Sequence, residues 1–471
     1  MSSIRVIAVL ALAAVAVPHA RQAGAPEPQI RARVDAFVEA LRGSSADAYE
    51  AMAQAHFSPA LLARAAPADR RAMFERLRGD FGAITVASVR VADGVASIAA
   101  RGATGLAGTF ELTIDPAPPH HVTRLGVEVG DGGPERDGPS IALKPDMPAA
   151  EMTRILDEHL TPLVAADAFA GVVLIARDGR PVVQRAYGVA DRARGVPIAT
   201  DLRFNIGSIN KVFTKVAIGQ LIAAGKLSLT DTVGALLPDY PDTPARRATV
   251  DQLLNHRAGI ADFFGPAFDA APKDRFRANA DYYRFVADQP VRFEPGARQA
   301  YCNGCYIVLG AIVERLSGMP YETYVAQRVF GPAGMKDAGA TASLPSPRTA
   351  IGYTRRNGPG SPDGPLQPNI ARLGASGSAA GGGYATAADL LAFDTALRTG
   401  VLLDPARTGW VLNSGPAGPG RARGGLGAAG GAPGLNADLE SDGTWTVVVL
   451  ANLDPPAAER VGRAIHRALT R

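Results

Sequence analysis

The sequence contains little lysine. Only 6 of its 49 basic residues are lysines, and the other 43 are arginines. Arginine does not lose its proton in proteins and so cannot act as a base, whereas a buried lysine can. In a chain that prefers arginine, a lysine beside a potential nucleophile therefore indicates a role in proton transfer.

Cysteine is also scarce, with Cys302 and Cys305 as the two examples. Two thiols cannot complete a zinc site without histidines, and none lies nearby in sequence. We expect two packed thiols, with a short structural disulfide or a redox role as alternatives, because an exported protein could be oxidised. The sequence implies no metal and no organic cofactor.

Long hydrophobic runs are missing except at the start, where residues 6–17 are apolar and follow Arg5. Such a run is too short to span a bilayer and is typical of a secretory signal peptide. We predict a signal peptide over residues 1–20 and a periplasmic or secreted protein. The region has no cysteine for a lipid anchor, and no later segment predicts a transmembrane helix.

The charge is nearly balanced, at +4 over 471 residues, and the basic residues are scattered. A nucleic-acid-binding protein would concentrate them in one patch or stripe. The charge distribution therefore argues against a nucleic-acid partner.

Hydrophobic spacing divides the chain into two parts. Apolar residues recur at helical spacing from about residue 28 to 78, and strand-like alternation follows from 84 to 129. We predict a small α+β domain over residues 27–129, similar in architecture to cystatin or nuclear-transport-factor-2-like folds. A linker over 130–147 is rich in glycine and proline, and the second domain covers 148–471.

The second domain is predicted to begin with a helix over 149–165 and a hairpin over 171–187. It is predicted to end with a strand over 445–452 and a helix over 457–469. Two segments rich in glycine, proline and alanine, 357–368 and 415–434, are interpreted as loops.

Two short motifs carry the chemistry. Ser208 and Lys211 lie three apart, which places them on one face of a helix. A serine hydroxyl needs an adjacent base to act as a nucleophile, and a desolvated lysine can supply it. About 90 residues later, Tyr301 and Asn303 form a Tyr-x-Asn motif.

These motifs resemble those of the serine β-lactamase and penicillin-binding-protein superfamily, in the branch of class C β-lactamases, D-Ala-D-Ala carboxypeptidases and related esterases. The resemblance covers about residues 150–470 and implies an α+β fold with an antiparallel sheet flanked by helices. Its landmarks are residues 204–213, 225–231, 253–259, 301–310, 381–386 and 430–452.

The resemblance implies a role for each motif residue. Ser208 would be the nucleophile at a helix N-terminus, and Lys211 would take its proton or keep Tyr301 anionic. Tyr301 would pass a proton to the leaving group, and a neighbouring ammonium can lower the pKa of its phenol. Asn303 would bind the substrate amide and position Lys211, with helix capping alone as the alternative.

The third family motif departs from the pattern. The family has a basic residue, a small residue and glycine where this chain has Ala428, Ala429 and Gly430. Losing the cation weakens the case for penicillins and D-Ala-D-Ala peptides. Gly430 and Gly431 remain predicted substrate-binding residues, with the N–H groups of Gly431 and Ser208 forming the oxyanion hole.

Three other basic side chains invite functional interpretations. Arg421 and Arg423 lie near the missing cation, but we expect them to be solvated. His256 could suggest a catalytic triad, but the family's matching histidine is mostly structural, and we expect the same here.

The sequence therefore predicts an exported serine hydrolase that acts through an acyl-enzyme on Ser208, on small esters or amides. A weak β-lactamase or D-Ala-D-Ala carboxypeptidase is the nearest alternative. A binding protein that has lost turnover is the alternative from another class.

Overall fold

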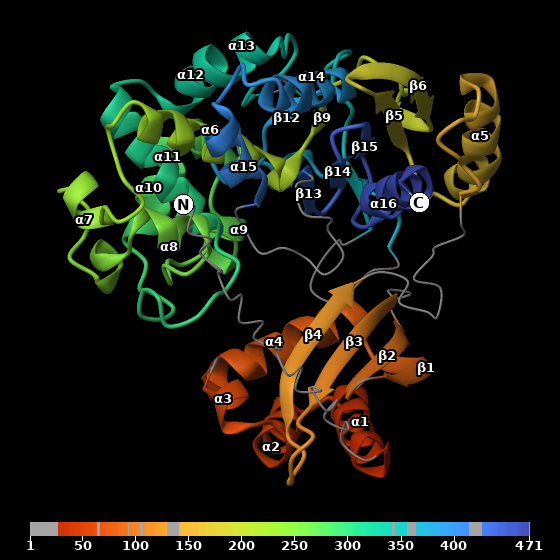
Figure 1. The fold of residues 1–471 in the computed structure, drawn as a ribbon, viewed down its shortest axis with the longest axis vertical. Helices are drawn as coiled ribbons and strands as arrows, with labels where there is room; N and C mark the ends of the chain where they lie inside the picture. Colours follow the sequence, from red (N-terminus) through yellow and green to blue (C-terminus); the bar gives the residue numbers. More distant parts are fainter. Residues whose placement is uncertain are drawn as a thin grey trace, which may run out of the picture.

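The computed structural model describes residues 27–63, 66–92, 94–103, 107–129, 141–341, 344–355, 364–413 and 426–470. The predicted signal peptide, most of the predicted linker, and Arg421 and Arg423 lie outside these ranges. The described residues form an amino-terminal unit, residues 27–129, and a carboxy-terminal unit, residues 141–470 (Figure 1). Each unit has its own hydrophobic core.

The amino-terminal unit consists of helices followed by an antiparallel sheet whose strands pair in chain order, β1-β2-β3-β4. The order of the elements follows the predicted change from helical to alternating spacing. Its elements are α1 Glu27–Arg42, α2 Ala46–His56, α3 Pro59–Leu62, α4 Pro67–Phe81, β1 Ile84–Ala92, β2 Val95–Gly102, β3 Ala107–Ile114 and β4 Val122–Val129.

Helical spacing in α1 places one apolar face against the sheet. Ile30, Val34 and Phe37 are buried on that face, and the Phe37 ring lies 5.6 Å from the ring of Phe110 in β3. Burial of this stripe stabilises the helix against the sheet, which is why its period was readable in the sequence. The resemblance to cystatin-like or nuclear-transport-factor-2-like folds stays a prediction.

The carboxy-terminal unit contains a five-stranded antiparallel sheet with the order β13-β14-β15-β5-β6. Strand β15 pairs with β5, so the end of the chain meets the beginning of the unit. The strands are β5 Gly171–Arg177, β6 Arg180–Tyr187, β13 Leu426–Ala432, β14 Leu435–Ser441 and β15 Trp445–Ala451. The predicted hairpin is confirmed, and Asp178 and Gly179 in its turn have φ values of 50° and 73°, as a primed hairpin turn requires.

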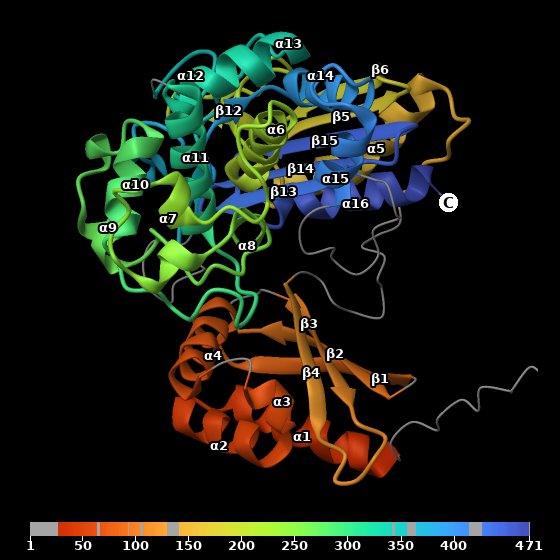
Figure 2. The ribbon, with the colours of Figure 1, turned by 60° about the vertical axis from the view of Figure 1, so that its left-hand side comes forward.

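Helices cover both faces of this sheet, and Figure 2 shows the layers. Helices α5 Ala149–Ala165 and α16 Ala457–Leu469, both predicted, pack on one face against Val173 and Val449. The other face, with Val172 and Val448, packs against the helical region. Burial on both faces explains why the central strands β5 and β15 are nearly continuous apolar runs. The predicted fold class is confirmed.

The helical region and the short strands lie between β6 and β13 in the chain. The helices are α6 Asn210–Ala223, α7 Val233–Leu236, α8 Val250–Leu254, α9 Pro266–Ala270, α10 Asn279–Ala287, α11 Asn303–Ser317, α12 Tyr321–Val325, α13 Gly331–Ala333, α14 Ala387–Arg398 and α15 Pro405–Asn413. The short strands are β7 Val189–Asp191, β8 Val196–Pro197, β9 Phe204–Asn205, β10 Tyr353–Thr354, β11 Gln367–Pro368 and β12 Tyr384–Ala385.

One predicted loop is partly wrong. The segment 415–434 was interpreted as a loop because of its composition, but residues 426–432 form β13 at the edge of the sheet. The small residues serve a close approach rather than a turn, because a Cβ atom on Gly430 would lie 2.0 Å from the carbonyl oxygen of Ile206. The strand thus runs directly beside the turn that carries Ser208.

Candidate active site

A short 3₁₀ turn, η1 Gly207–Ile209, leads into α6 and presents Ser208 and Lys211 on one side. Gly207 has φ 51°, a conformation that favours glycine, and its N–H donates to Oδ1 of Asn205 at 3.0 Å. Nζ of Lys211 lies 3.1 Å from Oγ of Ser208. The predicted pair is therefore within hydrogen-bond reach.

The start of α11 brings the second motif to the same place. The hydroxyl of Tyr301 lies 2.7 Å from Oγ of Ser208, and Oδ1 of Asn303 accepts a hydrogen bond from Nζ of Lys211 at 2.7 Å. Helix capping does not explain Asn303, because Cys302 occupies the N-cap position. Four of the predicted site residues, far apart in sequence, are thus joined by hydrogen bonds.

Lys211 is buried, with 6% of its surface exposed. Its ammonium donates to Ser208, to Asn303 and to the carbonyl oxygen of Ala380, and none of these oxygens is a carboxylate. Burial lowers the pKa of Lys211 to about 7, although the charge of Asp262 opposes the change. A substantial fraction of Lys211 is therefore neutral near pH 7 and able to accept a proton.

The expectation of a lowered pKa for Tyr301 is wrong. Desolvation is the main cause that raises the pKa of Tyr301 to about 12, even though 53% of the residue's surface is exposed. The hydrogen bond with Ser208 lowers this pKa by a smaller amount than desolvation raises it, and the charge of Asp262 raises it further. Lys211 does not hold the phenol in its anionic form, because Lys211 itself loses its proton at much lower pH. Of the two predicted roles for Lys211, the geometry and charges favour the one that accepts the serine proton.

His256 supports the tyrosine and does not contact Ser208 through any hydrogen bond among the described residues. Its ring stacks on Tyr301 with 4.8 Å between centroids, and its Nδ1 accepts the backbone N–H of Cys302 at 3.2 Å. Burial lowers the pKa of His256 to about 4, so the ring is neutral at physiological pH. This arrangement favours the predicted structural role over a catalytic triad.

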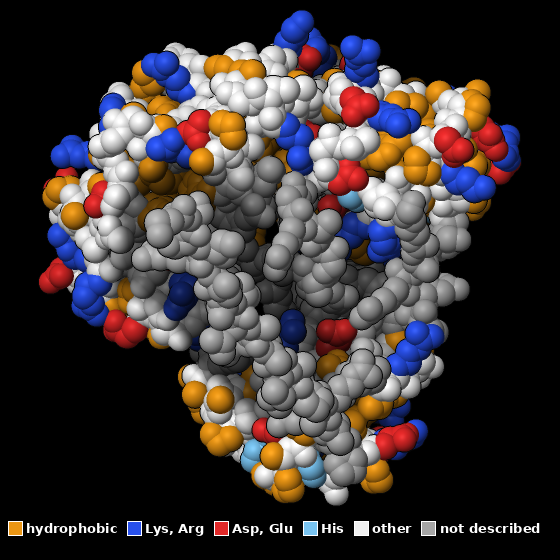
Figure 3. All heavy atoms as spheres, in the orientation of Figure 1, with side chains coloured by type: hydrophobic (Ala, Val, Ile, Leu, Met, Phe, Trp, Pro, Cys, Tyr) orange, Lys and Arg blue, Asp and Glu red, His pale blue; other side chains and the backbone are white. Residues whose placement is uncertain are grey.

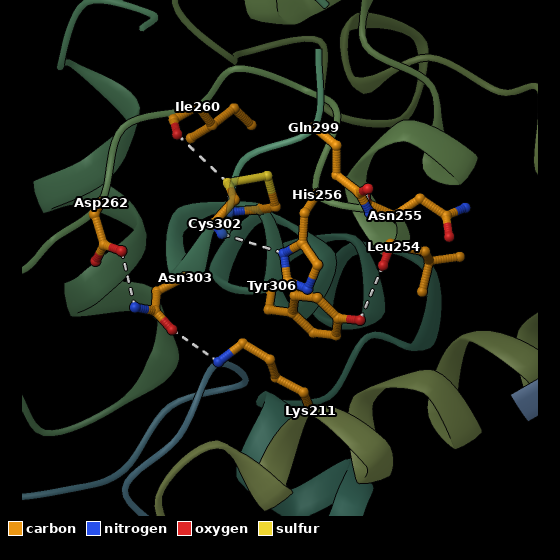
Figure 4. Close-up of a disulfide and its surroundings, with 11 residues drawn as sticks. Lys211, Leu254, Asn255, His256, Ile260, Asp262, Gln299, Cys302, Asn303 and Tyr306 are labelled. Carbon is orange, nitrogen blue, oxygen red and sulfur yellow. Dashed lines mark hydrogen bonds between the residues drawn. A yellow bond between two sulfur atoms is a disulfide. The ribbon is translucent and has the colours of Figure 1, made fainter. Parts of the chain in front are cut away.

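Cys302 and Cys305 form a disulfide, which corrects the prediction of two packed thiols. Cys302 has extended backbone at the N-cap of α11, and Cys305 lies in the first turn, so their Cα atoms are 5.3 Å apart. This separation lies within the range that a disulfide requires. Figure 4 shows the bond beside His256 and Asn303, so the cross-link ties the middle residue of the Tyr-x-Asn motif to the first turn of α11.

The backbone of β13 completes the site. A Cβ atom added to Gly430 would lie 2.8 Å from the nitrogen of Ser208, and one added to Gly207 would lie 2.9 Å from the nitrogen of Gly431. The N–H groups of Ser208 and Gly431 therefore belong to two segments that are in direct contact. Their role as an oxyanion hole stays a prediction.

Ala428, where the family pattern has its basic residue, lies in β13. Burial alternates along β13, and Ala428 lies on the same side as Gly430, the side that contacts Ile206 and Ser208. A longer basic side chain at Ala428 would start from this side of the strand. The alanine side chain is buried and brings no charge to the site.

Sequence reasoning missed two groups at the site, the Asp262 carboxylate and the Ala380 carbonyl. Oδ2 of Asp262 accepts from Nδ2 of Asn303 at 2.8 Å, which fixes the orientation of the amide that contacts Lys211. A single aspartate in a loop has no distinguishing pattern, and a backbone carbonyl has none at all. The one available signal was its position, because Asp262 lies three residues after the family segment 253–259.

Within the described ranges, no group of three or more His, Cys, Asp or Glu side chains could hold a metal ion, and no helix is long and apolar enough to cross a membrane. On the face drawn in Figure 3, basic and acidic side chains are interspersed over the coloured part of the surface.

The carboxy-terminal unit resembles a known protein family. The family described as Beta-lactamase matches residues 156–471, about two thirds of the chain. The chain belongs to the Beta-lactamase family. The match begins inside α5 and includes Ser208, Tyr301 and Gly430.

Curated relatives in this family differ in their names. The chain is 31% identical to the putative penicillin-binding protein PbpX of Bacillus subtilis over 50% of this chain and 56% of that protein. It is 30% identical to esterase EstB of Burkholderia gladioli over 44% and 54%, and 31% identical to a D-aminopeptidase of Brucella anthropi over 36% and 32%. The chain thus spans about half or less of the length of these relatives.

Solved structures agree on the fold. A penicillin-binding protein from Bacillus halodurans shares 29% identity and a TM-score of 0.57, over 66% of this chain and 99% of that one. A D-amino acid amidase from Ochrobactrum anthropi shares 26% identity and a TM-score of 0.55, over 66% and 96%. The chain therefore has the fold of the Beta-lactamase family, whose curated members include serine hydrolases with different substrates.

Proposed function

We propose that the protein is an exported serine hydrolase that forms an acyl-enzyme on Ser208, with small esters or amides as substrates. The observation that carries this proposal is the buried Lys211, with a pKa of about 7, 3.1 Å from the Ser208 hydroxyl. A lysine in this state can accept the serine proton as the serine attacks.

The proposed reaction assigns a step to each residue of the site. Oγ of Ser208 attacks the substrate carbonyl carbon while its proton moves to Lys211. The carbonyl oxygen becomes an oxyanion between the N–H groups of Ser208 and Gly431. The neutral Tyr301 hydroxyl, 2.7 Å from Oγ, gives its proton to the leaving group and regains one from the Lys211 side. Water then attacks the acyl-enzyme by the same route and releases the acid.

Two features support small esters or amides. In the family's pattern, a cation holds the carboxylate of penicillins and D-Ala-D-Ala peptides. Ala428 stands at that position and brings no cation. The names of the relatives include an esterase, a D-aminopeptidase and a D-amino acid amidase. The similarity to penicillin-binding proteins favours weak β-lactamase or carboxypeptidase activity as the second candidate.

Export to the periplasm or outside the cell is part of the proposal. It is supported by the apolar segment at residues 6–17 and by the Cys302–Cys305 disulfide, since disulfides persist mainly in oxidising compartments. Fusing residues 1–26 to a reporter enzyme that is active only after export tests this part. A reporter retained in the cytoplasm would contradict export.

The test of the reaction is the intact mass of the protein after brief exposure to p-nitrophenyl acetate or benzylpenicillin. We expect an acetyl adduct and p-nitrophenol release with the parent, and neither with Ser208→Ala. Ser228→Ala, at an exposed serine, is the matched control and should behave like the parent. A penicillin adduct instead would favour the second candidate, and an adduct without turnover would identify a binding protein. The absence of both adducts and turnover would overturn the hydrolase proposal.

A further inference from the structure

Asp262 lies in the loop between α8 and α9 and is partly exposed. Its Oδ2 accepts from Asn303 at 2.8 Å, and its Oδ1 accepts the backbone N–H of Phe264 at 3.1 Å. Figure 4 shows its carboxylate pointing toward Asn303, which in turn contacts Lys211. Three successive hydrogen bonds thus connect Asp262 with Ser208 through Asn303 and Lys211.

The Asp262 carboxylate has capacity for another donor. A carboxylate offers about four lone-pair sites, and the two hydrogen bonds use two of them. None of the described arginine or lysine side chains forms an ion pair with it. Its charge acts on the site, because it raises the pKa of both Lys211 and Tyr301.

Across the site, the cation that the family pattern places at position 428 is absent. The buried Ala428 occupies the position from which a basic side chain would reach the Ser208 turn. Lys211 is partly neutral near pH 7 and already donates to three oxygens. Two charged side chains act on Lys211: Lys215 is positive, and Asp262 is negative and hydrogen-bonded to Asn303 at the site.

Two exposed aromatic side chains lie beside this charge. Tyr301, at the site, is 53% exposed, and Phe264, bonded through its backbone to Asp262, is 54% exposed. Aromatic faces attract cations, and a carboxylate next to them strengthens the preference for an ammonium group.

We propose that Asp262 forms an ammonium subsite, so that the preferred substrates are amino-acid esters and amides with a free, protonated amino group next to the scissile carbonyl. In such a substrate, two bonds separate the ammonium nitrogen from the carbonyl carbon that Ser208 attacks. The Oγ–carbon bond forms, the carbon–nitrogen or carbon–oxygen bond to the leaving group breaks, and the leaving group takes the proton of Tyr301. Water then releases the free amino acid. This inference rests on the proposed acyl-enzyme at Ser208.

The experiment compares matched substrates on the full chain. Alanine p-nitroanilide, in each enantiomer, carries the ammonium group, and N-acetylalanine p-nitroanilide has the same leaving group without the charge. We expect at least one enantiomer of the free amine to have a kcat/KM about tenfold above that of its acetylated form, as for a hydrogen bond between charged groups. In Asp262→Asn this ratio should fall to about one, mainly through KM.

A control and a pH series isolate the charge. Asp269→Asn removes an exposed carboxylate seven residues later and should keep the parent ratio. Asp262→Glu should retain most of the preference. The ratio should also fall above pH 8, where the substrate's amino group loses its proton. Titration of Lys211 changes kcat/KM for both substrates by the same factor, so it does not change their ratio.

The possible failures are distinguishable. If p-nitrophenyl acetate gives no Ser208 adduct, the proposed function fails. If it gives one but the parent enzyme does not prefer the free amine, or Asp262→Asn keeps the preference, the ammonium subsite is overturned and the hydrolase stands. If Asp262→Asn does not fold, Asp262→Glu and the parent still test the subsite, because a parent ratio near one, or one that does not fall above pH 8, overturns it.

Discussion

Both units of the molecule bury a basic side chain, but they do so in different ways. In the amino-terminal unit, Arg70 is 5% exposed and forms an ion pair with Glu50, which is 6% exposed. In the carboxy-terminal unit, Lys211 is 6% exposed, and the three oxygens that accept hydrogen bonds from its Nζ are not carboxylates. Equal burial therefore has different electrostatic consequences.

The pKa values show the difference. The Arg70 guanidinium lowers the pKa of Glu50, so both partners stay charged at neutral pH. Lys211 has no carboxylate in contact, and burial lowers its pKa to about 7. A buried cation that is paired with a carboxylate keeps its charge and contributes to structure. A buried ammonium without a carboxylate partner loses its proton easily, and the neutral amine can then act as a base. The contrast separates the structural cation from the proposed catalytic one.

The largest expected effect comes from Lys211→Arg. Arginine keeps the positive charge but cannot accept the Ser208 proton, so kcat/KM for p-nitrophenyl acetate should fall about 10³-fold. Lys226→Arg, at an exposed lysine just after α6, is the matched control and should keep parent activity. An active Lys211→Arg enzyme would show that proton acceptance by Lys211 is not required.

Glu50→Gln should have the next largest effect, on stability. It leaves the Arg70 charge buried without a carboxylate, and the free energy of unfolding of the amino-terminal unit should fall by about 3 kcal/mol. Differential scanning calorimetry of the full chain measures this. Glu27→Gln breaks the exposed pair with Arg31 and should change stability by less than about 1 kcal/mol. Equal losses in the two variants would remove the distinction between buried and surface pairs.

Loss of the disulfide should destabilise one unit only. Replacing both Cys302 and Cys305 by serine should lower the free energy of unfolding of the carboxy-terminal unit by about 2 kcal/mol, the value for a short loop. Esterase activity should also fall, because Tyr301 and Asn303 flank Cys302. Both of the chain's 2 cysteines lie in the carboxy-terminal unit. The thermal unfolding transition of the amino-terminal unit is therefore the internal control, and its temperature should not change under reductant. A shift in that transition alone would contradict the assignment.

The smallest effect is a pH dependence. Below its pKa of about 7, Lys211 is an ammonium and cannot accept the serine proton. The kcat/KM for p-nitrophenyl acetate, which does not ionise, should therefore fall about tenfold per unit below pH 7 and level off above it. The plateau should persist to high pH because the pKa of Tyr301 is about 12. An inflection near pH 10 would indicate a fully solvated lysine instead.

Much of the fold was predictable because local spacing encodes burial. Helix α5 and the β5–β6 hairpin appear where apolar periodicity and the Asp178-Gly179 turn indicated them. Strand β13 was obscured because its alanines and glycines resemble those of a loop. Their purpose, close contact with the Ser208 turn, depends on a segment more than 200 residues away in sequence.

The site shows the same division. By itself the sequence determined which residues could carry the chemistry, because Ser208, Lys211, Tyr301 and Asn303 occur in short motifs with fixed spacing. It left open whether Cys302 and Cys305 are bonded, its expectation for the pKa of Tyr301 was wrong, and it missed the carboxylate of Asp262 at the site. Only the tertiary structure decided these, because a sulfur–sulfur bond, a shifted pKa and a carboxylate beside Asn303 depend on distances and burial between segments that the chain brings together on folding.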